Sequence, residues 1–212
     1  MMRLVIDTTS KNVLIALVKD TKVLSIYSEK IEKDLSTIFV DKIYSMLNEN
    51  SIKINDIDEI YVATGPGSFT GIRIGLTFSK VVSASLNIKL IPISSLELLA
   101  TTDLDADNIV SVIDARRDNV FAGIYDKNLN IIFKDSFISK ENLEKEVKKF
   151  KNIKYISNDN FEDIEVEKPN IDVIKCIEKH KNDDKLNPHS VNPNYLKLTE
   201  AEENLKKNDK NC

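Results

Sequence analysis

The sequence is poor in the residues that build disulfide frameworks and metal centres. Its 212 residues include two cysteines, Cys176 and Cys212, and no Cys-x-x-Cys pair, so we expect neither a disulfide scaffold nor a thiol-bound metal. The two histidines, His180 and His189, lie in a lysine-rich stretch without the His-x-x-x-His spacing of a catalytic zinc site. We therefore predict that both are solvated surface residues and that this chain holds no metal ion.

Two further absences restrict location and partners. No apolar run approaches the ~20 residues of a membrane-spanning helix, and the amino terminus meets Asp7 too early for a signal peptide, so a cytoplasmic location is expected. The formal net charge of −4 argues against a stand-alone nucleic-acid-binding protein, because such proteins cluster lysine and arginine. Arginine, which suits bidentate contacts, occurs only at Arg3, Arg73, Arg116 and Arg117.

Glycine is scarce, and four of the five glycines fall in residues 64–75, which read Thr-Gly-Pro-Gly-Ser-Phe-Thr-Gly-Ile-Arg-Ile-Gly. An apolar strand is predicted before this stretch, over 59–63, and an apolar helix after it, over 70–86. The stretch is therefore a strand–turn–helix junction. Gly65 and Gly67 permit positive φ angles and a close approach of the backbone.

The same junction has features of a helix start but no known phosphate motif. Ser68 or Thr70 can cap the helix. The spacing matches neither the dinucleotide-binding nor the P-loop pattern. Gly71 and Gly75 lie four residues apart and so share one helix face, where they would let a neighbouring helix or strand approach closely.

Two predicted helices, 36–48 and 70–86, carry more apolar surface than one face of a sheet can cover. In the first, Leu35, Phe39, Ile43, Met46 and Leu47 form one stripe, and further apolar residues widen it. The second is apolar in most directions. The surplus surface requires either a second helix of the same chain or a partner protein, and the pattern leaves both readings open.

The order of the predicted elements repeats. Strands are expected over 4–6, 13–18 and 23–27, then over 109–113, 119–125 and 131–137, and each triplet is followed by a helix and a further strand. Two such units are typical of an α/β protein of the actin-like (ASKHA) class, a duplicated ribonuclease H-like fold in which the second lobe is here reduced. We predict the following division: an N-terminal lobe over 1–104, a smaller lobe over 105–190 and a C-terminal segment over 191–212.

An aspartate ends the first strand of each unit, at Asp7 and Asp114. Asp7 and the hydroxyl side chains after it, starting with Thr8, are similar to the phosphate-binding hairpin of actin-like ATPases, although no glycine is present there. The plainer reading is a turn closed by a side chain. A salt-bridged turn is likewise the alternative for Asp114, Arg116 and Arg117.

Residues 65–75 resemble the TsaB (YeaZ) family, whose hallmark is Gly-Pro-Gly-Ser-Phe-Thr-Gly-[Val/Ile]-Arg-[Ile/Leu]-Gly. Further landmarks of that family lie at 6–9, 91–97, 114–117 and 193–197, in the expected order. The resemblance covers most of residues 1–125. The chain departs from the family at the start of the first helix, where Asp-Leu-Ser replaces a His-Ser pair, and in the second lobe, where Ser-Asn-Asp-Asn replaces a glycine-rich loop.

The resemblance implies a non-catalytic subunit of the complex that places a threonylcarbamoyl group on the adenosine beside the anticodon of ANN-decoding tRNAs. The expected partners are a TsaD-type catalytic paralogue and a TsaE-type ATPase, with a homodimer in isolation and tRNA contact only through the complex. The complex is expected to use ATP, a metal ion in the partner and threonylcarbamoyl-adenylate, and the chain no cofactor of its own. Two alternatives are a small ATPase or kinase using Asp7 and Asp114, and a peptidase, although a metallopeptidase would need ligands that are missing here.

The resemblance also implies two groups of site residues. The partner interface is expected to comprise Phe39, Val40, Ile43, Tyr44, Leu47, Gly71, Ile72, Ile74, Gly75, Phe78 and Val82. The motif loop, with a structural role or a weak nucleotide contact, is expected to comprise Asp7, Thr8, Gly65, Gly67, Ser68, Phe69, Thr70, Arg73, Asp114, Arg116 and Arg117. We expect Gly75→Leu or Ile74→Asp to abolish assembly and to leave a folded monomer.

Overall fold

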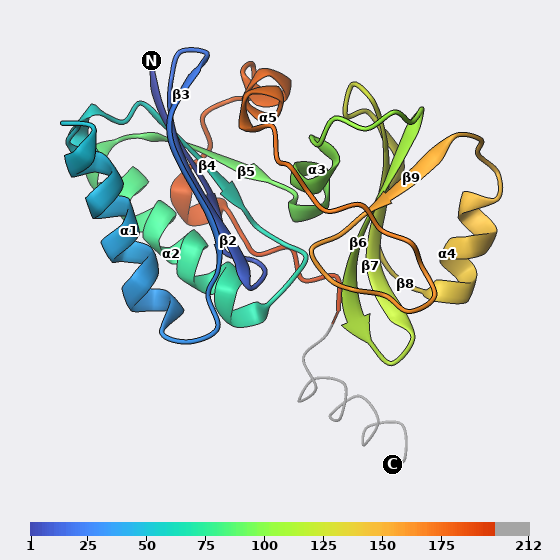
Figure 1. The fold of residues 1–212 in the computed structure, drawn as a ribbon. Helices are drawn as coiled ribbons and strands as arrows, with labels where there is room; N and C mark the ends of the chain where they lie inside the picture. The colour runs from blue at the N-terminus through green and yellow to red at the C-terminus, as the bar shows by residue number, and fades with distance from the viewer. Residues whose placement is uncertain (198–212) are drawn as a thin grey trace.

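The computed structural model describes residues 1–197 and shows two β-sheets with helices on both sides of the first (Figure 1). The part of the predicted C-terminal segment after residue 197, including Cys212, lies outside the described residues. Within the described part, no helix is long and apolar enough to cross a membrane.

The first sheet has five strands in the order β3-β2-β1-β4-β5. The three N-terminal strands pair antiparallel, whereas β4 is parallel to β1 and β5 is parallel to β4. The strands are β1 (Met2–Asp7), β2 (Asn12–Lys19), β3 (Lys22–Lys30), β4 (Glu59–Ala63) and β5 (Lys89–Ile93). Every residue of β4 is buried, as expected for a central strand covered on both faces.

The second sheet repeats this connectivity over four strands, in the order β8-β7-β6-β9. Its strands are β6 (Asn108–Arg116), β7 (Asn119–Asp126), β8 (Ile131–Ser139) and β9 (Ile153–Ile156). As in the first sheet, three antiparallel strands are followed by a helix and a parallel strand, here β9 beside β6. The prediction of a duplicated ribonuclease H-like, actin-like fold with a reduced second lobe is confirmed.

The helices form layers around these sheets (Figure 1). The helices α1 (Leu35–Glu49) and α2 (Phe69–Leu86) share a core with one face of the first sheet, and α4 (Lys140–Val147) shares a core with one face of the second. Between the sheets lies α3 (Ser95–Ala100), whose residues Leu98 and Leu99 belong to the cores on its two sides. Two short 3-10 helices, Ile54–Asp56 and Pro188–Ser190, complete the elements.

The helix α5 (Val173–His180) belongs to the first sheet in space, although it follows the second sheet in the chain. Its buried residues Val173, Cys176 and Ile177 pack with Val5 and Leu14 of that sheet. This packing connects the two lobes. The predicted division assigned residues 173–180 to the smaller lobe, over 105–190, but α5 packs on the sheet of the N-terminal lobe.

Serine side chains cap three of the helices, including α2 as predicted at Ser68, whereas α1 has no side-chain cap. The hydroxyl oxygens of Ser68, Ser94 and Ser139 each accept a backbone N–H at the start of α2, α3 and α4. At α1 the preceding residue, Asp34, is left-handed with φ of 55° and its side chain makes no capping bond. Within residues 1–197, the start of α1 is therefore left without a side-chain cap.

Candidate functional site

Residues 65–71, the glycine-rich part of the motif loop, pack against the turn between β1 and β2. The backbone N–H of Ser68 donates to the carbonyl oxygen of Thr9 at 2.7 Å, and the hydroxyl of Thr8 donates to the carbonyl oxygen of Gly71, also at 2.7 Å. A Cβ atom at Gly67 would overlap the carbonyl oxygen of Thr9, and one at Gly71 would overlap that of Thr8. Glycine is needed at these positions because the chain's own turn touches them.

This packing corrects three residues of the expected partner interface. Gly71 and Gly75 face β1 and its following turn, since a Cβ at Gly75 would overlap the hydroxyl of Thr8. Ile72 is 1% exposed. The spacing of the glycines identified a small-residue face, but the neighbour on that face is a strand of the same chain. Gly75→Leu would therefore disturb the fold itself, so that it cannot serve as a test of assembly.

Asp7 closes a turn rather than facing an open cleft. It is 8% exposed, and its carboxylate accepts the backbone N–H of Thr9 at 2.7 Å. Burial raises the pKa of Asp7 above its ordinary value, and the hydrogen bonds from Thr9 only partly offset this. Because the motif loop lies directly against Thr8 and Thr9, the surroundings of the turn are occupied by the chain's own backbone.

The matching turn of the second lobe has the same bond in an exposed setting. The carboxylate of Asp114 accepts the backbone N–H of Arg116 at 2.8 Å, and the N–H of Asp114 donates to Asp159 at 2.8 Å. Arg116 and Arg117 are exposed and have positive φ angles of 65° and 52°. Within residues 1–197, no group of three or more His, Cys, Asp or Glu side chains is placed to hold a metal ion.

The C-terminal segment brings two of the sequence landmarks together. The N–H of Asn194 donates to Thr64 at 2.8 Å, and the ring of Tyr195 packs on that of Phe69 with 4.6 Å between centroids. The hydroxyl of Tyr195 accepts Nε of Arg73 at 3.0 Å. Two residues later Lys197 reaches the carbonyl of Ala115 at 3.5 Å, beside the Asp114 turn. The segment thus connects the motif loop with the second lobe.

A shallow apolar groove runs between α1 and α2 on the outer side of the first lobe, where the two helices lie side by side (Figure 1). Its floor includes the edge-to-face pair of Phe39 and Phe78, with 5.3 Å between ring centroids. Tyr44 and Val81 stand on its rims and remain 58% and 59% exposed. We call this feature the α1–α2 groove; it is lined by Ser36, Phe39, Val40, Ile43, Tyr44, Leu47, Ile54, Arg73, Ile74, Thr77, Phe78, Val81, Val82, Ser85 and Leu86.

Eight of the residues expected at the partner interface line this groove, namely Phe39, Val40, Ile43, Tyr44, Leu47, Ile74, Phe78 and Val82. Val81, the most exposed large apolar residue of either helix, was missed by the sequence reasoning. Because Val81 follows Phe78 by three residues, the two lie on the same helix face, and this spacing could have identified it. Arg73, expected in the motif loop, also lines the groove.

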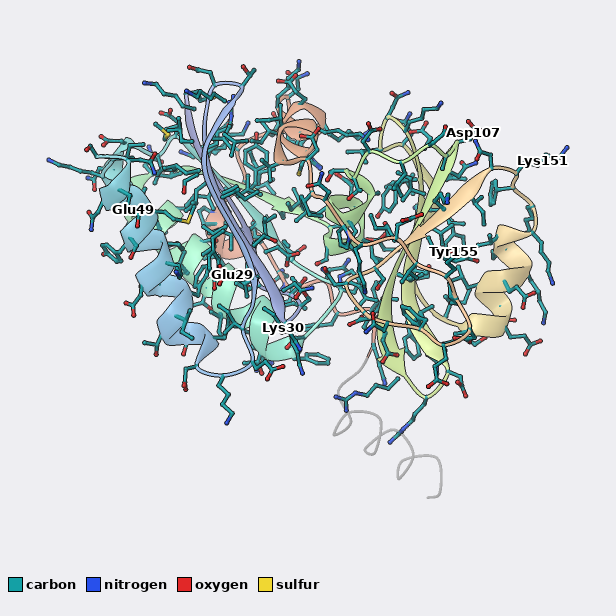
Figure 2. The ribbon with its side chains drawn as sticks, viewed as in Figure 1. Glu29, Lys30, Glu49, Asp107, Lys151 and Tyr155 are labelled. Carbon is teal, nitrogen blue, oxygen red and sulfur yellow. The ribbon has the colours of Figure 1, made fainter. Side chains whose placement is uncertain are left out.

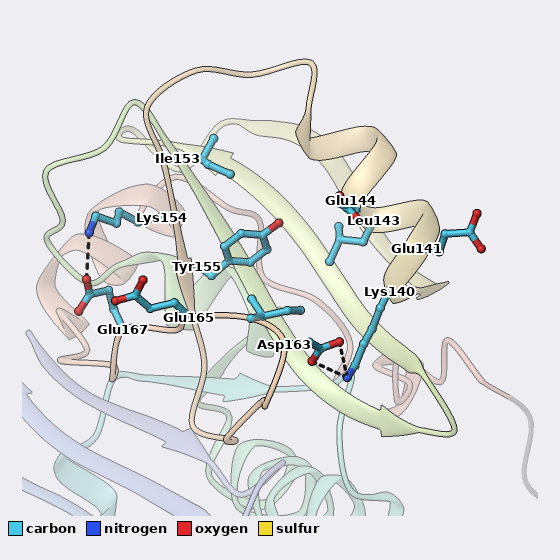
Figure 3. A pocket seen from close by; sticks show the side chains of 11 residues that line it. Lys140, Glu141, Leu143, Glu144, Ile153, Lys154, Tyr155, Asp163, Glu165 and Glu167 are labelled. Atoms are coloured by element: carbon cyan, nitrogen blue, oxygen red, sulfur yellow. Dashed lines mark hydrogen bonds and ion pairs between the residues drawn. The ribbon is translucent and has the colours of Figure 1, made fainter.

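A second hollow lies in the second lobe and is polar (Figure 3). Charged side chains at its edge pair with one another, since Lys140 contacts Asp163 at 2.8 Å and Lys154 contacts Glu167 at 3.2 Å. Tyr155 lies between these pairs in the view of Figure 3. The mutual pairing leaves this hollow a weaker candidate for ligand binding than the α1–α2 groove.

The expectation that His180 is a solvated surface residue is wrong. Its ring lies 2.5 Å from the carboxylate of Glu97 and 2.7 Å from that of Asp183, and its side chain is 15% exposed. Burial lowers the pKa of His180, but its hydrogen bonds and charge attraction with Glu97 and Asp183 outweigh this and raise the pKa above its ordinary value. Because Glu97 is 83 residues distant in the chain, no local pattern could reveal the pair.

Comparisons with known proteins agree with the fold. The family model described as TsaD, tRNA N6-adenosine threonylcarbamoyltransferase, matches residues 23–203. The tRNA threonylcarbamoyladenosine biosynthesis protein TsaB of Bacillus subtilis is 38% identical over 123 residues, which cover 58% of this chain and 54% of that protein. The TsaB protein of Buchnera aphidicola subsp. Schizaphis graminum is 29% identical over 155 residues, or 70% and 73% of the two chains.

Solved structures show the same fold. A Pseudomonas aeruginosa protein described as uncharacterized and similar to peptidase YeaZ superposes with a TM-score of 0.76 at 18% identity, over 92% of this chain and 99% of that one. YeaZ from Pseudomonas aeruginosa gives a TM-score of 0.61 at 24% identity, over 66% and 68% of the two chains. The matched region spans about half the length of Bacillus subtilis TsaB. Because the family model matches most of its length, the chain belongs to the TsaD family, and it is similar to the TsaB proteins named above.

Proposed function

We propose that this chain acts in the formation of threonylcarbamoyladenosine in tRNA as a non-catalytic subunit, and that it docks through the α1–α2 groove onto a TsaD-type paralogue. The observation that carries the proposal is the groove itself, an apolar surface that the described part of the chain leaves exposed. The TsaB relatives, which are described as tRNA threonylcarbamoyladenosine biosynthesis proteins, support the pathway.

The composition of the groove suits a protein partner. The centre is aromatic and aliphatic, with Phe78 on the floor and Tyr44 and Val81 standing exposed. Arg73 is the single charged residue among those that line it, and it lies at one end. An apolar centre depleted of charge with polar residues at the edge is the usual anatomy of an interface. Exposed Tyr44 is of the residue type that most often dominates binding energy.

A paralogue is the occupant that the fold favours. A family model named for the catalytic protein matches this chain over 181 of its residues, 23–203, so the two proteins share an architecture. A partner with the same fold carries a helix pair at the same place, and two such pairs can pack as a four-helix bundle. The TsaE-type ATPase, ATP, the metal ion and threonylcarbamoyl-adenylate belong to the proposed complex as a whole, and tRNA would be contacted through it. No residue of this chain is assigned to hold any of them.

The non-catalytic role is supported by the surroundings of Asp7. An actin-like ATPase would use this aspartate in an accessible site, whereas here the residue is buried and bonded to Thr9. The same kind of bond recurs at Asp114, which favours turn closure as the common task of both aspartates.

The test compares two substitutions of matched exposure. Val81→Asp places a charge on the groove, and Ile131→Asp places one on the edge strand β8 of the second lobe, where Ile131 is 57% exposed. Because an unpaired charge would be buried on docking, we expect Val81→Asp to weaken binding to the purified TsaD-type paralogue roughly 30-fold or more in calorimetry. Ile131→Asp should bind as the wild type does.

Equal affinity of both variants would contradict the docking site. In cells depleted of the chain, nucleoside mass spectrometry should show a loss of threonylcarbamoyladenosine that Ile131→Asp restores and Val81→Asp does not. Normal levels in the depleted cells would contradict the function. A wild-type chain that self-associates but does not bind the paralogue would contradict the choice of partner.

A further inference from the structure

The two helices that form the groove run in the same direction. Each connects strands that are parallel to one another, α1 between β3 and β4 and α2 between β4 and β5, and each returns along the sheet. Consistent with this, Ser36 and Arg73 line one end of the groove, and Leu47 and Leu86 line the other. Both N-termini therefore lie at the Arg73 end.

Neither helix compensates its own dipole. The first turns of α1 and α2 contain no acidic residue, and their last turns contain no basic residue. Each helix end carries roughly half an elementary charge, positive at the N-terminus and negative at the C-terminus. With both helices aligned, the groove has a positive end beside Arg73, which Asp34 before α1 partly offsets, and a negative end, to which Glu49 in the last turn of α1 adds its charge (Figure 2). At the end of α2, Lys185 donates to the carbonyl oxygen of Asn87 at 2.9 Å, so the negative end is carried mainly by α1.

Arg73 strengthens the positive end and is held in place from outside the helix. A cation near a helix N-terminus is disfavoured by the dipole, so Arg73 gains nothing from α2 itself. Its Nε donates to the hydroxyl of Tyr195 at 3.0 Å, and Tyr195 is fixed in turn by its contact with Phe69. A guanidinium has five N–H donors in a planar fork, so one bond orients the group and leaves four donors at the groove end.

We propose that Arg73, positioned by Tyr195, determines the direction in which the partner helices lie in the groove. Arg73 receives the C-terminal end of a helix of the TsaD-type paralogue, either its free carbonyl groups or an acidic side chain there. The partner's helix pair consequently lies antiparallel to α1 and α2. This inference rests on the proposed function, because it assumes that the paralogue occupies the groove.

Charge complementarity selects this arrangement over the parallel one. In antiparallel packing the negative C-terminal ends of the partner helices face Arg73, and their positive N-terminal ends face Glu49. In parallel packing like ends would meet, and Arg73 would face two further positive helix termini. Hydrogen bonds from a guanidinium to carbonyl or carboxylate oxygens are also among the strongest that an interface forms.

The first experiment measures affinity for the purified TsaD-type paralogue by calorimetry at low salt. Arg73→Glu should weaken binding about tenfold or more, the scale of a lost hydrogen bond to a charged group. Tyr195→Phe, which removes only the positioning hydroxyl, should weaken it about threefold and leave thermal unfolding unchanged. Lys42→Glu is the matched control: it makes the same change of charge on α1, but Lys42 lies over the ring of Tyr27, away from the groove.

The second experiment determines the direction of the partner helices in the groove by photo-crosslinking. A benzoylphenylalanine photo-crosslinker at Ser36 should label the C-terminal turns of the partner helices, and one at Ser85 should label their N-terminal turns. The reverse pattern overturns the inference, as does wild-type affinity in Arg73→Glu. If Val81→Asp still abolishes binding in that case, the proposed docking site stands and only its direction is wrong. If neither substitution changes affinity, both proposals fail.

Discussion

The helices that cover the outer faces of the two sheets can be compared directly, because the lobes repeat one architecture. On the first sheet, α1 and α2 carry Tyr44 and Val81 exposed to solvent. On the second sheet, α4 is covered by ion pairs within its own length and just beyond its end, Lys145 with Glu141, Lys148 with Glu144 and Lys149 with Glu146. Glu141 in the first turn of α4 and Lys145 in the last also match its dipole.

The surface of α4 is suited to contact with water, whereas the surfaces of α1 and α2 leave apolar side chains exposed. Charged pairs and matched helix ends are the ordinary features of a solvated helix. Among residues 1–197 no ion pair and no matched helix end is found on α1 or α2, and this, together with the apolar groove between them, supports the proposal that they contact another protein. The comparison therefore agrees with the proposal that the first lobe carries the partner contact, whereas α4 of the second lobe has the features of a solvated helix.

The loops beside the turns that follow Asp7 and Asp114 also differ between the two lobes. In the first lobe Gly67 and Gly71 bring the motif loop against the Thr8–Thr9 turn. In the second lobe the corresponding loop contains Asp159 and Asn160, and Asp159 bonds to the N–H of Asp114 through its side chain. One contact is made by backbone packing and is intolerant of added atoms. The other is made by an exposed side chain.

The largest expected effect is that of Gly71→Ala. The added methyl group would overlap the carbonyl oxygen of Thr8, whose hydroxyl is bonded to the carbonyl oxygen of Gly71, so α2 must shift away from β1. We expect a loss of roughly 3 kcal/mol in the free energy of unfolding, measured with urea. The matched substitution in the second lobe, Asn160→Ala, should cost less than about 0.5 kcal/mol. Similar losses for the two variants would remove the distinction between the loops.

An intermediate effect is expected at His180, which joins α5 to Glu97 on α3. Because the pKa of His180 is raised in the folded state, its stabilisation is fully present below the ordinary histidine pKa and is lost as the pH rises through the raised value. Between pH 6 and pH 9 the wild type should lose on the order of 1 kcal/mol more unfolding free energy than His180→Gln does. Parallel pH profiles of the two proteins would contradict the pairing.

The smallest effect is expected on α4. Lys148→Ala removes one exposed ion pair, with Glu144, and should cost about 0.3–0.5 kcal/mol in thermal unfolding. Affinity for the paralogue should stay at the wild-type value, because α4 has no part in the proposed interface. A clear loss of affinity in Lys148→Ala would break the assignment of contact to the first lobe alone.

Local patterns in the sequence were sufficient for the elements and for the cap of α2. Alternating and continuous apolar runs predicted the strands, and Ser68 was one of the two residues predicted to cap the helix after the motif loop. Positive φ angles at Gly65 and Gly67 also follow from the local sequence. These features are determined by residues that are close in the sequence, so they can be predicted from a local pattern.

Features that depend on distant neighbours were not predictable in the same way. Periodicity placed Gly71 and Gly75 on one face of α2 but did not say that this face meets β1. It could not show that α5 packs on the first sheet. Nor could it pair His180 with Glu97. Each of these contacts joins segments that are brought together only by the fold.

Hydrogen–deuterium exchange of the chain, alone and with the purified TsaD-type paralogue, tests the central claim most directly. Amides in a docked helix exchange more slowly because local opening is suppressed. The account predicts slower exchange in the peptides that cover α1 and α2 when the paralogue is bound, and unchanged exchange in those that cover α4. Protection of α4 together with unchanged exchange in α1 and α2 would contradict it.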